Sequence, residues 1–363
     1  MALNLKIIED KSFMEDDNPE IPPQDIVAYN ELRSCADLFR MHSQGILIIQ
    51  PEFQREIVWK PADQTRFIDS LIKQLPIPSM CFSLDFKMQK WQVIDGLQRM
   101  ASIVRFLSDT KWILSNLEDI DPKISGKSVA EFIDENSYLH DYYTRVENLT
   151  IPITVLRCDY SKQNHTNYLF TIFHRLNAGG MKLNNQEIRN CIYSGTFNQL
   201  LKDLNNNSNW MKINRMKKET GYRFTKQELI LRFFALHDRH KSYGGRLSRF
   251  LNDYMYEFKN PSQSFLNQKA EIFSRTVNII FKKLYGGKVP PKITVTILEA
   301  LLVGVSKNLN LLESEMAASI RDKYKRLLNH KEFSEQKLSE GLSGKARVIE
   351  RLDASISIFA DKK

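Results

Sequence analysis

The sequence has few cysteines and no long apolar run. Its four cysteines are scattered, without the paired spacing of a disulfide framework or a zinc site. The most apolar stretch, residues 295–305, contains Glu299 and is shorter than the roughly 18–20 residues that a membrane span needs. Residues 1–17 lack the basic start and apolar core of a signal peptide. We therefore expect a cytoplasmic protein with no membrane partner, and a buried helix at 295–305.

Several familiar catalytic patterns are also missing from the sequence. It contains no GxxxxGK[ST] phosphate loop, no GxGxxG, no GxSxG and no kinase signature. His237 and His240 are too close for the i, i+4 histidine pair of a metalloprotease helix, and no glutamate stands between them. These absences disfavour the common nucleotide-hydrolase, dinucleotide-binding and zinc-protease classes.

Charge is unevenly distributed along the chain. Residues 1–27 hold seven acids and two bases, so they carry −5, and the net charge of +9 leaves +14 for residues 28–363. A body this basic suits a polyanionic partner such as DNA, although excess surface lysine is an equally good explanation. The acidic, proline-bearing residues 9–25 indicate a flexible lead-in, which we extend to 1–27.

Hydrophobic periodicity predicts a mixed first half. We expect a helix over 30–42, a buried strand at 46–49 and a helix that starts at Lys60-Pro61 and has an apolar face of Phe67, Ile68, Leu71, Ile72 and Leu75. Strands at 80–85 and 90–94 then form a hairpin, a helix starts near Gln98, and a strand at 151–158 precedes helices at 164–176 and 184–204. Residues 109–150 are irregular and helical.

The second half is almost entirely helical in pattern. The strong helical segments are 226–237, 247–258, 264–284, 292–309 and 316–328. The fold class predicted is therefore α+β, with a mixed α/β domain at 28–205 followed by an all-helical domain at 206–363.

Two polar motifs interrupt the apolar pattern of the first domain. In the first, Gln54 and Arg55 follow a strand that ends in Pro51, and arginine offers a planar fork that suits phosphate oxygens. In the second, Asp95-Gly96-Leu97-Gln98-Arg99 lies at a strand-to-helix join, where free N–H groups favour an anion. Asp95 can cap the helix or hold a metal ion. A surface ion pair and an ordinary Asp-Gly turn are the structural alternatives.

A third polar block spans residues 173–189. A helix ends at Asn177 and a Gly179-Gly180 turn, and the next helix begins with a polar run. We interpret Asn177, Glu187 and Arg189 as walls or supports of the same site, with structural helix caps as the alternative.

A basic stretch follows in the second domain. Its cations, interleaved with Trp210 and Tyr222, suit a nucleic-acid backbone, and a solvated linker is the alternative. The nucleic-acid-binding residues that we predict are Lys212, Arg215, Lys217 and Lys218.

These blocks together resemble a known family. PEFQREIVW, DSLIKQLPIP, VIDGLQRMASIVRFL and FHRLNAGGMKLNNQEIRNCIYSG are similar to the N-terminal domain of GmrSD-type restriction systems, within the ParB/sulfiredoxin-like superfamily. The resemblance covers roughly residues 35–260, and the combination of blocks is far more specific than any one of them. It implies a ParB/sulfiredoxin-like domain that binds, and often hydrolyses, a nucleotide in modification-dependent phage defence.

The sequence departs from the family pattern at two places. Leu97 stands where relatives frequently have glutamine, which weakens one polar contact and leaves its neighbours intact. Many relatives carry an HNH nuclease in a second domain, but His330 is the one histidine after residue 240. We therefore expect this chain to lack an HNH nuclease, and either to work with a separate effector or nuclease or to serve in nucleotide-dependent DNA recognition.

Our first hypothesis is an NTP-binding regulator, a candidate Mg²⁺-dependent NTPase, of a DNA-directed response. The nucleotide-binding residues would be Gln54, Arg55, Asp95, Gly96, Gln98, Arg99 and Asn177, of which Asp95, Gln98 and Arg99 would act in catalysis. Asp95 would position the metal ion or a water molecule. Whether ATP or GTP is preferred, and whether it is cleaved, stays open.

Our second hypothesis is a non-catalytic module that binds DNA or docks a partner through the same basic pocket. Competition separates the two, because DNA and nucleotide exclude each other only if they share a pocket. Direct DNA cleavage is less favoured, since no cluster of metal-binding carboxylates is evident.

Overall fold

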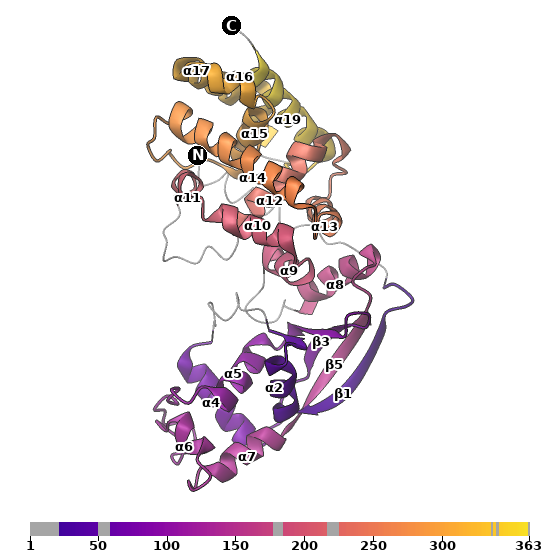
Figure 1. Ribbon diagram of the computed structural model, residues 1–363, viewed down its shortest axis with the longest axis vertical. Helices are drawn as coiled ribbons and strands as arrows, with labels where there is room; N and C mark the ends of the chain where they lie inside the picture. Colours follow the sequence, from indigo (N-terminus) through magenta and orange to yellow (C-terminus); the bar gives the residue numbers. More distant parts are fainter. Residues whose placement is uncertain are drawn as a thin grey trace. The chain divides into compact units, whose positions relative to one another are not determined.

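The computed structural model describes residues 22–49, 59–176, 184–215, 225–334, 337–338 and 341–361 (Figure 1). The chain divides into two compact units between Leu183 and Asn184. The first, from Glu20, combines helices with a five-stranded sheet and is called the α/β unit below. The second is called the helical unit, and its described residues form helices joined by loops. The α+β fold class predicted from the sequence is confirmed.

The α/β unit is built around a mixed sheet with the strand order β1-β5-β3-β4-β2. β3 and β4 form the predicted hairpin, β5 runs parallel to β3, and β1 pairs with β5 antiparallel at the edge. Its elements are β1 (Val27–Ser34), α2 (Cys35–Ser43), β2 (Leu47–Ile48), α4 (Pro61–Ile72), β3 (Met80–Asp85), β4 (Lys90–Asp95), α5 (Leu97–Ser108), α6 (Val129–Ile133), α7 (His140–Asn148), β5 (Thr150–Cys158) and α8 (Gln163–Leu176).

The predicted helix over 30–42 is wrong for its first five residues. Residues 27–34 form β1, and the helix begins only at Cys35, after Ser34 caps it by accepting a hydrogen bond from the Asp37 backbone N–H at 3.1 Å. β1 is an edge strand with an exposed outer face, and Leu32 is 67% exposed. An edge strand of this kind lacks the apolar alternation that identifies a half-buried strand in a sequence.

Helix α4 confirms its predicted start and most of its predicted face. Pro61 occupies the first turn, where a missing backbone N–H costs nothing. Phe67, Ile68, Leu71 and Ile72 are buried, but Leu75 is 48% exposed because the helix ends at Ile72 and Gln74 adopts a positive φ.

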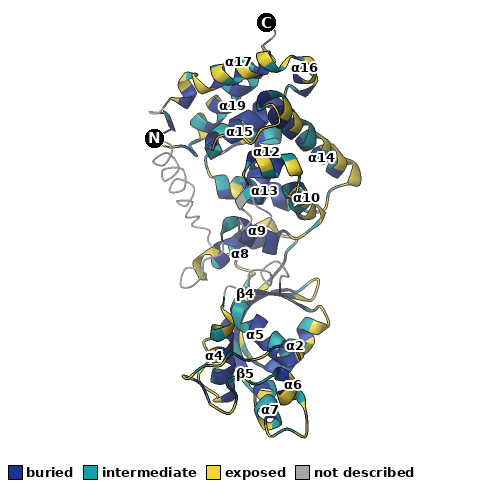
Figure 2. Ribbon diagram, turned by 90° about the vertical axis from the view of Figure 1, so that its left-hand side faces the viewer, coloured by how far each residue is buried: buried dark blue, intermediate teal, exposed yellow. Residues whose placement is uncertain are grey.

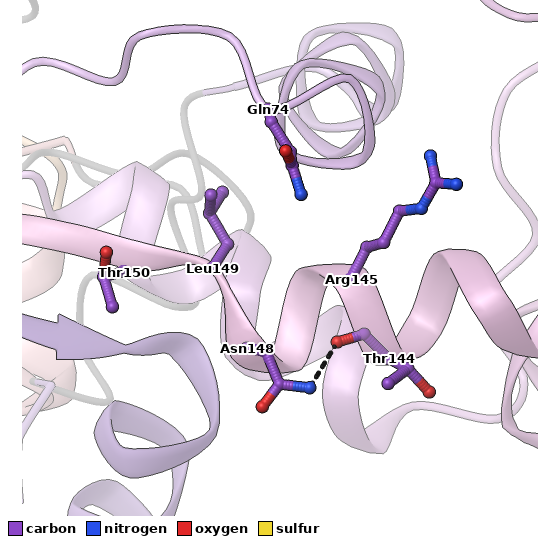
Figure 3. A pocket seen from close by; sticks show the side chains of 6 residues that line it. All are labelled: Gln74, Thr144, Arg145, Asn148, Leu149 and Thr150. Carbon is purple, nitrogen blue, oxygen red and sulfur yellow. Dashed lines mark hydrogen bonds between the residues drawn. The ribbon is translucent and has the colours of Figure 1, made fainter.

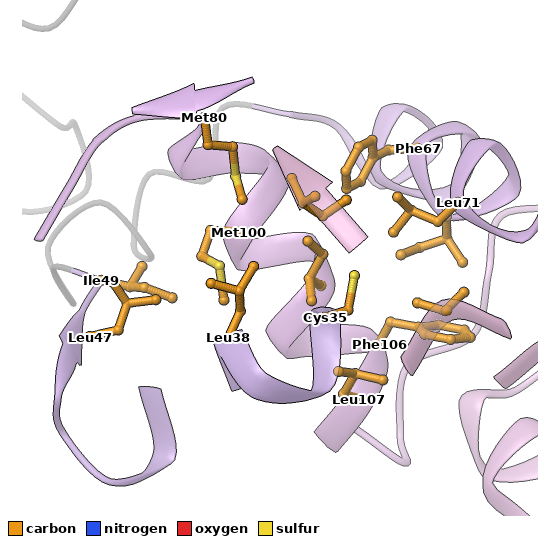
Figure 4. Packing of buried hydrophobic residues seen from close by; sticks show 14 of the residues in the cluster. Cys35, Leu38, Leu47, Ile49, Phe67, Leu71, Met80, Met100, Phe106 and Leu107 are labelled. Carbon is orange, nitrogen blue, oxygen red and sulfur yellow. The ribbon is translucent and has the colours of Figure 1, made fainter. Parts of the chain in front are cut away.

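Helices α2, α4 and α5 enclose the apolar core of this unit against one face of the sheet (Figure 4). Cys35 and Leu38 of α2 meet Met80 of β3 and Met100 and Phe106 of α5. This packing fixes where β4 ends and α5 begins, which is the join that carries the Asp95–Arg99 motif.

The helical unit is organised around α15, a helix in which ten of twelve residues are buried (Figure 2). Packing of α15 against α19 is close enough that a Cβ on Gly304 would lie 2.2 Å from Ser355 Oγ. The elements are α9 (Asn185–Ile192), α10 (Thr196–Asn205), α11 (Ser208–Ile213), α12 (Thr225–Arg239), η2 (His240–Ser242), α13 (Leu247–Glu257), α14 (Gln263–Asn278), η3 (Ile279–Leu284), α15 (Val295–Ser306), α16 (Leu309–Ser314), α17 (Ala317–Leu328), η4 (Lys331–Phe333) and α19 (Lys345–Ala360).

The apolar stretch at 295–305 forms α15, a buried helix as predicted. Glu299 in its middle is buried and accepts a hydrogen bond from Arg232 at 2.9 Å. Among the described residues, no helix combines the length and the apolar character needed to cross a bilayer.

The two units divide earlier than the predicted domain boundary after residue 205. Helices α9 and α10 belong to the helical unit, since Arg189 donates to Glu228 of α12 and Gln227 donates to Asn198. These contacts are made by polar side chains, so hydrophobic periodicity does not indicate them.

All four cysteines are buried and carry free thiols. Burial raises the pKa of the Cys35, Cys81 and Cys158 thiols to about 12. Cys191 is the one cysteine of the helical unit. The spacing of the cysteines in the sequence suggested no disulfide framework, and the four thiols are free in the structure.

Candidate functional site

Gly96 makes the sharp turn between β4 and α5. It is the N-cap of α5 and adopts φ +92°, a left-handed conformation that L side chains rarely adopt. A Cβ at this position would lie 2.5 Å from Met80 Cγ, so glycine is also needed for packing. The side of Gly96 on which a Cβ would stand is therefore occupied by Met80.

Arg99 ties the first turn of α5 to the loop that precedes β3. Its Nη1 donates to the carbonyl oxygens of Pro78 and Ser79, and its Nη2 donates to Asp95 Oδ2 at 3.0 Å. The Arg99 side chain is only 15% exposed, whereas that of Asp95 is 39% exposed. Burial lowers the pKa of Arg99, and Asp95 opposes part of that effect.

The first turn of α5 carries the features of an anion-binding helix start. No side chain of the described residues caps its N-terminus, and no acidic residue occupies the first turn. The macrodipole and the free backbone N–H groups of such a turn favour negative charge. Arg99 adds a cation within that turn, so the predicted group Asp95, Gly96, Gln98 and Arg99 is brought together at one place.

Gln98 connects this motif to the chain that follows the first Gln-Arg pair. Its Oε1 accepts a hydrogen bond from the Trp59 backbone N–H at 3.4 Å, and the Trp59 ring packs edge-on against Phe67 with centroids 5.5 Å apart. Gln54 and Arg55 lie outside the described residues. The hydrogen bond from Trp59 to Gln98 therefore links the Asp95–Arg99 motif to a residue four positions after Arg55.

A polar ladder beside the motif was not predicted from the sequence. Ser79 Oγ lies 3.3 Å from Thr154 Oγ1, which donates to Asn30 Oδ1 at 2.9 Å. These side chains come from three neighbouring strands or their ends, in the register Met80↔Ile153 and Asn30↔Thr154. The signal was weak, because each residue is a single polar position in a strand or loop of ordinary composition.

The third polar block has structural roles in the helical unit. Asn184 and Glu187 form a capping box at the start of α9, which confirms the alternative of a helix cap for Glu187. The Arg189 side chain, 1% exposed, donates to Glu228 Oε2 at 2.8 Å and Asn252 Oδ1 at 2.9 Å. Asn177 lies outside the described residues.

Arg189 belongs to a buried chain of charges. Glu228 also pairs with Arg232 at 2.7 Å, and Arg232 reaches Glu299 at 2.9 Å. Burial alone would raise the pKa of Glu228, but Arg232 and Arg189 outweigh it and hold that pKa below its ordinary value. Such a chain of paired charges fixes the helices that contribute to it.

The predicted nucleic-acid-binding stretch is described only in part. Lys212 and Arg215 are exposed, Lys217 and Lys218 lie outside the described residues, and Trp210 is fully buried. Trp210 packs against Phe273 in the core and has no surface available for a base.

A shallow hollow of about 370 Å³ lies at the start of β5 (Figure 3). Its lining includes none of the predicted site residues, and Arg145 is the one charged side chain in it. The lining residues are Gln74, Thr144, Arg145, Asn148, Leu149 and Thr150. Across the described residues, no three His, Cys, Asp or Glu side chains gather in a group that could hold a metal ion.

Comparison with protein families finds a similarity in the first half of the chain. The family model described as GmrSD restriction endonuclease, N-terminal domain matches residues 35–194. Neither a curated protein nor a solved structure matches the chain. The matched segment begins at the first residue of α2, contains the Asp95–Arg99 motif and ends just after α9. Residues 35–194 are therefore similar to the N-terminal domain of GmrSD restriction endonucleases, and the match does not extend to the rest of the chain.

Proposed function

We propose that this chain binds a nucleoside triphosphate at the start of α5 and thereby regulates a DNA-directed restriction response. The observation that carries the proposal is the uncapped first turn of α5, with Arg99 beside it and no acid within it. Phosphate oxygens would satisfy the backbone N–H groups that the described side chains leave without a cap. The similarity of residues 35–194 to the N-terminal domain of GmrSD restriction endonucleases supports a restriction system as the biological setting.

In this proposal each residue of the motif has a separate role. Arg99 contributes positive charge while its bonds to the Pro78 and Ser79 carbonyls hold it in place. Gln98 keeps the chain at Trp59 close to the phosphate site. By the family resemblance, Gln54 and Arg55 would also contact the nucleotide.

The fit of Mg²⁺ is restricted to one carboxylate. Mg²⁺ is usually held by one or two carboxylates together with substrate phosphates and water, which Asp95 and a bound nucleotide can supply. Asp95 is paired with Arg99 at 3.0 Å, so it would exchange this partner for the metal ion. We propose binding and not hydrolysis, because one carboxylate, Asp95, together with Arg99 and the predicted Arg55 can hold a triphosphate without cleaving it.

Calorimetric titration of ATP and GTP, with and without Mg²⁺, tests the proposal. We expect micromolar binding to the wild-type chain and its loss in Arg99→Ala. Arg105→Ala is the matched control, because Arg105 is a half-buried arginine at the other end of α5 that bonds Gln64 and Asp109. Circular dichroism and the thermal midpoint of each variant establish that it is folded.

Three outcomes would count against the proposal. No binding of either nucleotide to the wild type at any Mg²⁺ concentration rejects it. Equal losses in Arg99→Ala and Arg105→Ala would show that helix α5 is merely destabilised. If duplex DNA displaces the nucleotide in the same assay, the motif is instead a shared phosphodiester pocket, as in our second hypothesis.

A further inference from the structure

A second basic region of the helical unit extends well beyond the stretch that the sequence analysis singled out. Residues 279–298, IIFKKLYGGKVPPKITVTIL, contain four lysines and no acid. Lys288 and Lys292 are exposed, as are Lys212, Arg215 and Arg321 of other segments. We call these five side chains the Lys288 surface.

Three contacts bring these segments together. Arg215 Nε donates to the Pro290 carbonyl oxygen at 3.1 Å, and Lys212 Nζ lies 5.2 Å from the centroid of the Phe281 ring. Arg321 Nε donates to the Leu284 carbonyl oxygen at 3.2 Å. Lys212 of α11, Arg215 just after it and Arg321 of α17 therefore all lie next to residues 281–290. These segments are far apart in the sequence.

Glu313 and Glu315, whose backbone carbonyl oxygens contact Lys283, are paired with other cations. Glu313 pairs with Arg275 at 2.8 Å, and Glu315 pairs with Lys323 at 2.6 Å. Lys283 is held by three backbone carbonyl oxygens at the end of α16 and shortly after it, so it fastens the segment.

The backbone within this surface is open to close approach. Gly286 and Gly287 follow the π-helical turn η3 with φ of +62° and +74°. A Cβ on Gly287 would meet nothing within 4 Å, and one on Gly286 would be 3.6 Å from Arg321 Nη2. A phosphate group can therefore come close to the glycine backbone and the surrounding cations together.

The aromatic residues of this region favour a double-stranded ligand over a single-stranded one. Binding of single strands relies on exposed rings that stack on bases. Here Trp210 and Phe281 are buried and Tyr285 is half-buried. Backbone contacts by lysine and arginine are instead the mode of sequence-independent duplex binding.

We propose that the Lys288 surface binds the phosphodiester backbone of duplex DNA. This site uses none of the α5 residues, so it goes beyond the proposed nucleotide site and stands independently of it. It would hold DNA without reading its sequence, which leaves recognition of a particular base or modification to other contacts.

Fluorescence anisotropy with a labelled 30-base-pair duplex and the full-length chain tests this proposal, without any nucleotide present. In Lys288→Glu/Lys292→Glu we expect the Kd to rise roughly tenfold or more, and the salt dependence of log Kd to fall by about two contacts. The matched control is Arg246→Glu/Lys345→Glu, which reverses two exposed cations beside Gly245, after the far end of α12. We expect this control to bind like the wild type.

Each alternative outcome overturns the assignment. If both double variants lose affinity equally, general charge and not the Lys288 surface attracts DNA. Tighter binding of a single strand of equal length would indicate base stacking. If polyglutamate, but not duplex DNA, binds in a manner that depends on Lys288 and Lys292, the partner is an acidic protein. Since no nucleotide is present, none of these results bears on the nucleotide site.

Discussion

The charged motif of the α/β unit and the charged chain of the helical unit differ in how deeply they are buried. In the α/β unit the polar motif lies at the rim of the sheet, where Asp95 is half-buried and Arg99 bonds mainly to loop carbonyls. In the helical unit, charges are paired in the interior, as in Arg189 with Glu228 and Lys269 with Asp238. A rim ion pair can exchange partners with a ligand, whereas a buried one serves to fix its helices.

This difference explains why two similar arginines have different roles. Arg99 and Arg189 both stand in polar blocks of the matched segment and both lie on a helix. Arg189 is surrounded by Glu228 and Asn252 inside its own unit. The partner of Arg99 is Asp95, whose side chain is 39% exposed. A ligand can therefore reach this ion pair, and we place the ligand beside it.

The largest expected effect comes from breaking the buried chain of charges. Arg189→Met leaves Glu228 with one arginine fewer, and loss of a buried partner typically costs about 3–5 kcal/mol. Urea unfolding of the variant measures this loss. Arg249→Met is the control, since Arg249 is half-exposed with a carboxylate at 3.9 Å and should cost less than about 1 kcal/mol. Equal costs in the two variants would show that burying an ion pair of the helical unit does not increase its contribution to stability.

A smaller effect is expected from the turn at the rim. Gly96→Ala combines a left-handed backbone with a clash against Met80, and we expect a loss of about 2–3 kcal/mol. Gly126→Ala has a similar φ of +71° but its Cβ would meet nothing nearer than 3.9 Å, so about 1 kcal/mol is expected. Chemical denaturation of both variants isolates the contribution of Met80, and a cost at Gly96 no larger than at Gly126 would show that Met80 simply moves aside.

The helical unit should also respond to mild acid through His237. Burial, followed by the nearby Lys307, lowers the pKa of His237 to about 4 in the folded state, whereas an unfolded histidine titrates near 6.5. Between these values the unfolded chain binds more protons, so stability is lost as pH falls from about 6.5 to 4. Between pH 6.5 and 4, we expect His237→Gln to lose less of its free energy of unfolding than the wild type does, by on the order of 2 kcal/mol. His174→Gln, at an exposed position, should leave the slope unchanged in the same pH series of unfolding curves.

The smallest effect is expected from an exposed pair in the α/β unit. Lys162 and then His165 hold the pKa of Asp25 at about 2, below the ordinary value near 4. A carboxyl with a depressed pKa contributes stability above its unfolded pKa and loses it as pH falls through its folded pKa. In Asp25→Asn, the part of the acid-induced loss that falls between pH 4 and 2 should therefore become smaller. An unchanged acid transition would show that solvent screens the pair completely.

The turn between β4 and α5 could be predicted from the sequence because residues adjacent in the chain determine it. Asp95 and Gly96 stand between an apolar strand and an amphipathic helix, so periodicity alone places them at the join. The hairpin of β3 and β4 and the start of α4 at Pro61 are of the same kind. In each case neighbouring residues decide the conformation.

The features that escaped prediction depend on distant residues. β1 pairs with β5 more than a hundred positions away, and its exposed face gives no alternating pattern. The buried partners of Arg189 come from α12 and α13, and a polar side chain in a sequence does not indicate which other polar side chain it will meet. The ladder of Ser79, Thr154 and Asn30 arises from strand register for the same reason.

The buried cysteines make it possible to measure how fast each unit opens. A thiol reacts as its thiolate, and burial keeps the Cys35, Cys81 and Cys158 thiols protonated and out of reach of reagents while the chain is folded. Alkylation therefore requires the surrounding structure to open. Three of these sites belong to the α/β unit and Cys191 belongs to the helical unit. The chain thus carries natural reporters from which the opening rate of each unit can be read separately by mass spectrometry, without any engineered label.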